Sequence, residues 1–130
     1  MHLKTLGTEE HNQDRWTVEF HPEFEREFAR LPESVRKHVF ASGKLLEQFG
    51  PQLGRPHVDT LYGSRHSNMK ELRFRAENGA WRIAFSFDPR RRAILLVAGD
   101  KSGVSSDKFY RDLIRVADRR LARHLERLGL

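Results

Sequence analysis

The chain has 130 residues, of which 38% are hydrophobic and 32% charged, and these proportions suit one globular domain with a charged surface. It has no cysteine, which excludes disulfides, thiol catalysis and cysteine-ligated zinc, and fits a reducing cytoplasm. No apolar run approaches the ~20 residues of a membrane span, and the polar N-terminus has no signal core, so we expect a cytoplasmic protein with no membrane partner.

Positive charge is concentrated in the second part of the chain. Residues 1–60 carry 8 basic and 10 acidic side chains, whereas residues 61–130 carry 16 basic and 8 acidic ones. Such an excess of positive charge favours a polyanionic partner, and nucleic acid is the commonest one. The alternative is a basic surface that only keeps the protein soluble.

The N-terminal part of the chain predicts one strand followed by two helices. Residues 1–14 lack periodicity and are expected to form a flexible tail, which leaves 15–130 as a single domain. Hydrophobic residues alternate over 15–20, which predicts a strand. They recur at helical spacing over 22–31 and again over 32–49, which predicts an antiparallel helical hairpin that needs a sheet to cover its apolar face.

A β-hairpin is the clearest feature of the middle of the chain. Residues 50–68 are rich in Gly, Pro, Ser and His and predict an ordered loop. Beyond it, Asn78-Gly79 lies between two alternating runs, a strong hairpin signal. A turn at these two residues would oppose Arg75 to Arg82, which is unfavourable unless an anion lies nearby. The same register pairs Arg73 with Ala84 and Glu71 with Ser86.

This pairing gives the hairpin one apolar face and one charged face. The apolar face is expected to cover the helices, and the charged face carries Glu71, Arg73, Arg75 and Arg82. Residues 93–98 are apolar throughout, as in a strand buried on both faces. A last helix, capped by Ser106 or Asp107, is expected to run to about Leu128. The order of elements predicts an α+β domain with a small, mostly antiparallel four-stranded sheet.

Four segments with these residues resemble the RelE/ParE toxin superfamily, and more closely its HigB-like, phage-derived members. The segments are GRPHVDTLYGS (54–64), NMKELRFR (68–75), WRIAFSFDPRRRAILLVAGDKSG (81–103) and KFYRDLIRVAD (108–118). The resemblance implies a RelE-like fold and a toxin that cleaves messenger RNA in the ribosomal A site. It also implies a cognate helix-turn-helix antitoxin and no cofactor.

The resemblance further implies which residues act on RNA. In RNA-cutting members the sheet presents arginines and lysines, and a tyrosine comes from the C-terminal segment. The matching catalytic positions are Arg73, Arg82, Lys101 and Tyr110. Further RNA contacts are expected from Lys70, Glu71, Arg75, Arg90, Arg91, Arg92, Arg111 and Arg115. Active-site residues vary across this superfamily, and its gyrase-poisoning members do not cut RNA.

These residue types suit cleavage by the 2′-hydroxyl that RNA itself carries. Arginine binds phosphate oxygens in pairs and never loses its charge, so it suits stabilisation of the phosphorane. A lysine or tyrosine among arginines should have a lowered pKa, which suits proton transfer. Glu71 would be either a general base or a carboxylate that neutralises arginines. The histidines and carboxylates show no metal-ligand spacing, so we expect no metal.

Less specific interpretations remain for these residues and for the whole chain. Lys101 could be a turn lysine paired with Asp100, and Tyr110 a rim aromatic that covers the core. The chain could instead be a non-catalytic ParE-like toxin that inhibits DNA gyrase by protein contact. A third interpretation is a decayed toxin that only binds RNA or a partner.

Overall fold

The computed structural model describes residues 15–130, so the prediction of a flexible tail over 1–14 lies outside the described part. The strands are β1 (Thr17–Phe20), β2 (Val58–Thr60), β3 (Lys70–Ala76), β4 (Gly79–Phe87) and β5 (Arg92–Asp100). The helices are α2 (Pro22–Phe28), α3 (Glu33–Phe49), the short 3-10 helix η1 (Gly50–Gln52) and α4 (Ser106–Arg127). The α+β class predicted from the sequence is confirmed.

The sheet has five strands and is mixed, so the prediction of four strands is wrong. Its order is β1-β5-β4-β3-β2. The additional strand is β2, whose three residues pair antiparallel with β3. The sequence predicts a loop there, because so short a run shows no alternation. β1 runs parallel to β5, while the other neighbours are antiparallel. The sheet therefore places the β3–β4 hairpin beside β5 on one side and β2 on the other.

The turn of this hairpin lies one residue earlier than the sequence predicts. Glu77 and Asn78 both have positive φ angles, 51° and 59°, as a two-residue type I′ turn requires. Gly79 is instead the first residue of β4, where a Cβ atom would lie 2.6 Å from the Asp100 carboxylate. The glycine thus allows a close approach and does not make the turn. The register moves by two residues, which leaves every side chain on its predicted face.

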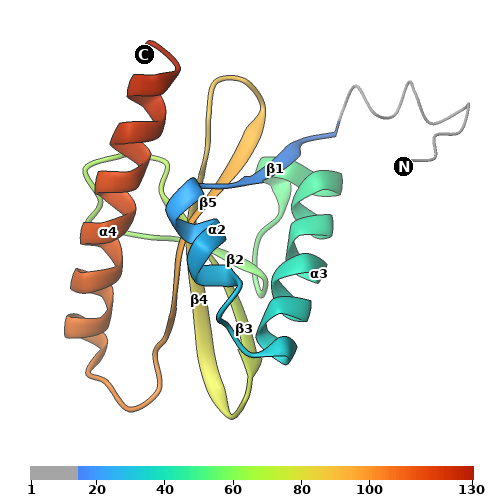
Figure 1. Cartoon of the computed structure of the whole chain (residues 1–130), viewed down its shortest axis with the longest axis vertical. Helices are drawn as coiled ribbons and strands as arrows, with labels where there is room; N and C mark the ends of the chain where they lie inside the picture. The colour runs from blue at the N-terminus through green and yellow to red at the C-terminus, as the bar shows by residue number, and fades with distance from the viewer. Residues whose placement is uncertain (1–14) are drawn as a thin grey trace, which may run out of the picture.

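The three main helices cover the two faces of the sheet (Figure 1). α2 and α3 bury the apolar face over a core whose largest members include Phe24, Leu46 and Phe85. The predicted helical hairpin is wrong in the length of its first helix, which ends at Phe28. α2 has only seven residues and packs against β5 and β1, while α3 packs against β3 and β1. The two helices meet through Phe28 and Phe40, whose ring centroids are 5.3 Å apart.

α4 packs on the opposite face, which is also the face of the predicted arginines. Its buried stripe, Phe109, Leu113, Ala117 and Leu121, contacts β4 and β5. Gly99 permits this approach, because a Cβ atom there would lie 2.9 Å from the Phe109 ring. The cap is Ser105, whose side chain accepts a hydrogen bond from the Lys108 amide, and neither Ser106 nor Asp107. The first turn of α4 therefore lies beside the charged side of the hairpin.

Candidate active site

Two arginines face each other across the middle of the sheet. Arg73 on β3 pairs with Arg82 on β4, so the predicted opposition of Arg75 to Arg82 is wrong. The Arg73 amide donates to His57 O on the other side, at 2.9 Å, and so does not point toward β4. The pair is therefore of the non-hydrogen-bonded kind, in which opposed side chains come closest. Two like charges at this spacing need anions near them.

Arg82 is held in a fixed position by hydrogen bonds. Only 7% of the residue is exposed. Its Nε donates to the Tyr110 hydroxyl at 3.2 Å, and Nη1 donates to Trp81 O at 3.0 Å. Its Nε also lies 3.7 Å from Glu71 Oε1. The guanidinium thus keeps a single orientation on the charged face before any ligand arrives.

Glu71 is one of the anions that the arginine pair needs. The residue is 5% exposed, and its carboxylate accepts a hydrogen bond from the Tyr110 hydroxyl at 2.9 Å. Its second oxygen lies 4.0 Å from Arg73 Nε. Burial raises the pKa of Glu71 above its usual value, although Tyr110 and the two arginines act in the opposite direction. The carboxylate is consequently a stronger base than an exposed glutamate.

Tyr110 connects α4 to the arginines and the carboxylate. Its hydroxyl accepts from Arg82 and donates to Glu71. The prediction of a lowered pKa is wrong for this tyrosine. Burial and the Glu71 carboxylate raise its pKa, and they outweigh the hydrogen bond from Arg82. Lys101 completes the group, with its ammonium nitrogen 5.7 Å from the centroid of the Tyr110 ring.

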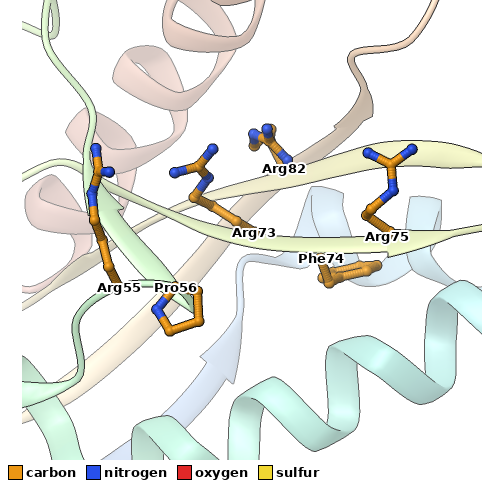
Figure 2. A pocket seen from close by; sticks show the side chains of 6 residues that line it. All are labelled: Arg55, Pro56, Arg73, Phe74, Arg75 and Arg82. Atoms are coloured by element: carbon orange, nitrogen blue, oxygen red, sulfur yellow. The ribbon is translucent and has the colours of Figure 1, made fainter.

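The arginines line an open hollow of about 670 Å³, formed by Arg55, Pro56, Arg73, Phe74, Arg75 and Arg82. We call this the arginine hollow. Figure 2 shows its four arginine side chains rising on one side of the sheet, while Phe74 points toward α3. A smaller hollow of about 300 Å³ is lined by Glu71 and Tyr110 among others. Site residues thus border two hollows of the same face.

Sequence reasoning missed two residues of this region, Arg55 and Asp59. Arg55 Nη2 donates to Asp59 Oδ2 at 2.6 Å, and the same oxygen lies 3.6 Å from Arg73 Nη1. A hydrogen bond from the Thr60 amide, together with Arg55, lowers the pKa of Asp59. The β-branched residues Val58 and Thr60 around Asp59 are the one signal that could have predicted a strand here. Asp59 is the second anion beside the arginine pair.

The structure separates the remaining predicted RNA contacts into three groups. The first group lies near the site: Arg75 lines the arginine hollow, and Arg111 and Arg115 line a further hollow that includes Tyr110. The second group is a single residue. Lys70 alternates to the face opposite Glu71 and so lies away from the cluster. The third group, Arg90, Arg91 and Arg92, lies at the β4–β5 turn.

This turn is some distance from the arginine pair, at the other end of β4. There Arg92 pairs with Asp88 at 2.9 Å and with Glu19 at 3.4 Å. The Arg91 guanidinium lies 4.6 Å from the centroid of the Trp16 ring. Both side chains therefore have contacts within the fold, whereas the Arg90 side chain is exposed at the same turn.

Two further features bear on the predicted absence of a metal and a membrane span. Within residues 15–130, no group of three or more His, Cys, Asp or Glu side chains is arranged to hold a metal ion. In the same part of the chain, no helix combines the length and apolar character that a membrane crossing requires. The metal-independent reaction remains a prediction.

Sequence comparisons place the chain among phage-derived proteins. The family model described as phage-derived protein Gp49-like (DUF891) matches residues 26–122. A Mycobacterium tuberculosis protein named as toxin HigB2 is 50% identical over 88 residues, which are 67% of this chain and 43% of that protein. One named as toxin HigB3, from the same organism, is 44% identical over 99 residues, 76% of this chain and 84% of that protein. The chain thus spans less than half of the first relative and most of the second.

Solved structures with this fold include bacterial toxins. A double arginine-to-alanine mutant of Escherichia coli toxin RelE in the free state superposes with a TM-score of 0.56 and 11% identity, over 77% of this chain and 94% of that chain. The toxin–antitoxin complex RelBE2 of M. tuberculosis gives a TM-score of 0.50 and 16% identity, over 66% of this chain and 91% of that chain. At such low identities the similarity shows the fold alone, which is RelE-like.

Proposed function

Since the chain belongs to the phage-derived Gp49-like family, which confirms the HigB-like resemblance of its sequence, we propose that it is the toxin of a toxin–antitoxin pair and cleaves messenger RNA on the ribosome. The observation that carries this proposal is the opposed pair of Arg73 and Arg82, with Glu71 and Tyr110 in contact with it. An inhibitor that acts only by protein contact needs no such buried, hydrogen-bonded group.

The reaction follows from the contacts of these four side chains. Arg73 and Arg82 stabilise the charge of the phosphorane, because guanidinium groups bind phosphate oxygens in pairs. The Glu71 carboxylate takes the proton of the 2′-hydroxyl, which then attacks the neighbouring phosphorus. Tyr110 gives its proton to the leaving 5′ oxygen. The 2.9 Å hydrogen bond between Tyr110 and Glu71 then returns the proton from the glutamic acid to the tyrosinate.

The raised pKa of Glu71 fits its role as the base, whereas burial and the Glu71 carboxylate raise the pKa of Tyr110 and make it a weaker acid than an exposed tyrosine. The hydrogen bond from Arg82 to the Tyr110 hydroxyl acts in the other direction, because it stabilises the tyrosinate that proton transfer leaves. Burial makes Glu71 a better base than an exposed carboxylate. The products would be a 2′,3′-cyclic phosphate and a 5′-hydroxyl. Lys101, beside the Tyr110 ring, would hold that ring or contact a neighbouring phosphate.

We also propose a helix-turn-helix antitoxin as the partner that silences this activity. The basis is the relationship to the proteins named as HigB toxins, together with the fold shared with the toxin in the RelBE2 complex. Co-expression of the product of a neighbouring short helix-turn-helix gene should restore growth. That product should co-purify with this chain. Growth arrest that persists with every neighbouring gene product would contradict this partner.

The test of the enzymatic proposal is cleavage of a defined message on translating ribosomes. The wild-type protein should cut within the translated region and leave cyclic phosphate ends, and protein synthesis should stop. The same preparation should leave gyrase supercoiling unchanged. Intact message with inhibited gyrase would favour the ParE-like alternative. Intact message with both processes unaffected would favour a domain that only binds.

A further inference from the structure

A second hollow beside the proposed base and acid has no role in the reaction. This hollow, of about 300 Å³, is lined by Asp59, Thr60, Leu61, Tyr62, Glu71 and Tyr110, and we call it the tyrosine hollow. Two of these residues, Glu71 and Tyr110, transfer the protons in the proposed reaction, so the hollow borders the reacting atoms. Its volume is at the lower end of the ~300–1,000 Å³ that is typical of small-ligand pockets. The hollow therefore suits one ring system next to the reaction.

Tyr62 extends into solvent at the edge of this hollow. The residue is 83% exposed, the highest value among the exposed large hydrophobic residues within 15–130. Exposed aromatic residues that occur singly are common and do not by themselves indicate a site. This one differs because it borders the hollow that contains Glu71 and Tyr110. The exposed face of its ring is available to a flat ligand.

The loop that carries this tyrosine is fixed to α4 by a buried carboxylate. Asp118 of α4 is 6% exposed and accepts hydrogen bonds from the Ser64 hydroxyl and, at 3.1 Å, from the Arg65 amide. On the other side of the tyrosine, the Leu61 amide donates to Met69 O at 3.0 Å, and both of these side chains are buried. The exposed ring thus extends from a backbone that is held on both sides. Such a ring loses little conformational freedom when it binds a ligand.

The chemistry of RNA brings a base to this hollow. The attacking 2′-hydroxyl is on C2′ of the ribose, and the base is on the adjacent C1′. A ribose whose 2′-hydroxyl approaches the Glu71 carboxylate therefore holds its own base close to Glu71. The leaving 5′ oxygen belongs to the next nucleotide, whose base is several bonds further away. Because the scissile phosphate lies at the arginine pair, the tyrosine hollow remains for the base on the 5′ side of the cut.

Asp59 offers two hydrogen-bond acceptors at the polar edge of the hollow. It is the cross-strand partner of Glu71, so the two side chains lie on the same face. The Thr60 amide uses one lone pair of Oδ1, and Arg55 uses one of Oδ2. Arg73 lies 3.6 Å from Oδ2, beyond hydrogen-bond distance. Since a carboxylate has about four lone pairs, each oxygen keeps one for a ligand.

This pair of acceptors matches one base better than the others. Guanine presents two adjacent N–H donors, at N1 and N2, on its Watson–Crick edge. They can form two parallel hydrogen bonds to one carboxylate, whereas uracil has carbonyl oxygens on both sides of its single N–H donor. Unpaired RNA bases are recognised in proteins by this combination of stacking on an aromatic ring and hydrogen bonds to the base edge.

We propose that the tyrosine hollow binds the base of the nucleotide whose 2′-hydroxyl attacks, with the base stacked on Tyr62 and with guanine selected by Asp59. The proposal rests on the proposed function and adds a base preference to it. Tyr62 binds the base and takes no part in proton transfer. Its contribution depends on the aromatic ring and not on the hydroxyl, so Tyr62→Phe should retain it.

The experiment combines protein variants with messages that differ in one base. Messages programmed on ribosomes carry guanosine, inosine or uridine on the 5′ side of the mapped cleavage site; inosine lacks only the N2 amino group of guanosine. Wild type, Tyr62→Ala, Tyr62→Phe, Asp59→Asn and the control Phe49→Ala are compared by kcat/KM. Phe49 is a 44% exposed aromatic residue at the end of α3, on the other face of the sheet. Thermal unfolding of each preparation checks the fold.

The wild type should cut the guanosine message about tenfold faster than the inosine message, because one hydrogen bond to a carboxylate is lost. Tyr62→Ala should lower kcat/KM about tenfold on every message, as loss of a base–aromatic stack does, whereas Tyr62→Phe and Phe49→Ala should match the wild type. Asp59→Asn should cut the guanosine and inosine messages equally. This ratio cancels any general loss that follows from the contacts of Asp59 with arginines.

Two outcomes would overturn the inference alone. One is a Tyr62→Ala variant that matches Phe49→Ala while the wild type cuts. The other is a wild type that cuts the guanosine, inosine and uridine messages at equal rates. A wild type that cuts no message would overturn the proposed function.

Discussion

Arg82 and Arg120 are nearly equally buried, yet their surroundings differ. Arg120 on α4 is 4% exposed and makes two hydrogen bonds to the Glu27 carboxylate, at 2.9 and 2.5 Å. It also lies 3.2 Å from Glu23 and donates to Leu96 O at 2.7 Å. Arg82 is 7% exposed, but its hydrogen bonds go to a tyrosine and a carbonyl, and its one carboxylate neighbour is 3.7 Å away.

The difference lies in whether the positive charge is neutralised. Arg120 links α2 to α4. It also donates to the carbonyl of Leu96, a residue of β5 that lies beyond the segment paired with β1. Its guanidinium charge is neutralised by the two carboxylates that it contacts, Glu23 and Glu27, although Glu23 also lies within 4 Å of the exposed Arg119 and Arg123. Arg82 instead opposes another arginine in a hollow with excess positive charge. A buried arginine therefore indicates a site only where its own fold leaves it incompletely neutralised.

The largest effect should come from Arg82→Ala. We expect cleavage on ribosomes to fall between about a hundredfold and a thousandfold, because charge stabilisation of the phosphorane is lost. Thermal stability should change by less than about 1 kcal/mol, since removal of the opposition to Arg73 offsets the lost contact with Glu71. RNA binding should weaken only modestly. A folded variant that cuts like the wild type would remove Arg82 from the active site.

Arg120→Ala should have the reverse profile. The change leaves Glu27 and the Leu96 carbonyl without their partner, so we expect the free energy of unfolding to fall by about 3 kcal/mol. Cleavage per folded molecule should stay at the wild-type level. Chemical denaturation and the ribosome assay on one preparation measure both quantities. Arg119→Ala, at the exposed neighbouring position, is the control, and an equal loss in that variant would contradict the role given to Arg120.

Glu71→Gln tests whether the carboxylate of the site is a base or only a counter-charge. Because its pKa is raised, the wild-type rate should fall as pH decreases through that value and the carboxylate becomes protonated. The variant should be slower by about a hundredfold, and this acidic limb of its pH profile should disappear. Glu33→Gln, at an exposed position of α3, is the matched control. An acidic limb that survives in Glu71→Gln would leave the carboxylate only a neutralising role.

A purely structural pH effect should come from His21 at the N-terminus of α2. Burial and nearby Arg127 lower its pKa to about 4, and its Nδ1 accepts from the Glu23 amide. The unfolded chain therefore binds a proton below about pH 6.5 that the native state does not, so stability should fall by up to about 3 kcal/mol as pH drops toward 4.

His21→Asn isolates this effect, because asparagine caps a helix and does not titrate. The variant should lose less stability than the wild type between pH 6.5 and 4, in urea unfolding at several pH values. Burial raises the pKa of Asp88, but its hydrogen bonds lower that pKa by more. Asp88 therefore titrates below this pH range in both proteins. Identical pH curves for wild type and variant would exclude His21 as the source.

The smallest expected effect is that of a chelator. The proposed reaction uses only side chains and the 2′-hydroxyl, so EDTA should leave cleavage unchanged once the magnesium needed by ribosomes is supplied separately. The assay titrates chelator at constant free magnesium. Loss of cleavage that is restored by another divalent ion would contradict the proposed reaction and require a metal site.

The sequence by itself determined the features that repeat along the chain. The four-residue periodicity of α4, the alternation of β3 and β4 and the apolar run of β5 all follow from which side chains must be buried. The charged face of the hairpin was predicted correctly although its turn was misplaced. A shift of two residues returns every side chain to the same face, because a strand has a period of two.

Only the tertiary structure decided which of these residues meet. The three residues of β2 show no periodicity, so the sequence does not place Asp59 and Arg55 at the site. Their place there follows from the pairing of β2 with β3. Gly79 lies not in the turn but in β4, where a Cβ atom would lie 2.6 Å from the carboxylate of Asp100, a residue far from it in sequence. The raised pKa of Tyr110 depends on burial by the packing of α4, whereas residue types predicted the opposite shift. Local sequence patterns do not show which residues that are far apart in the chain come into contact. Such contacts determine the geometry of the site.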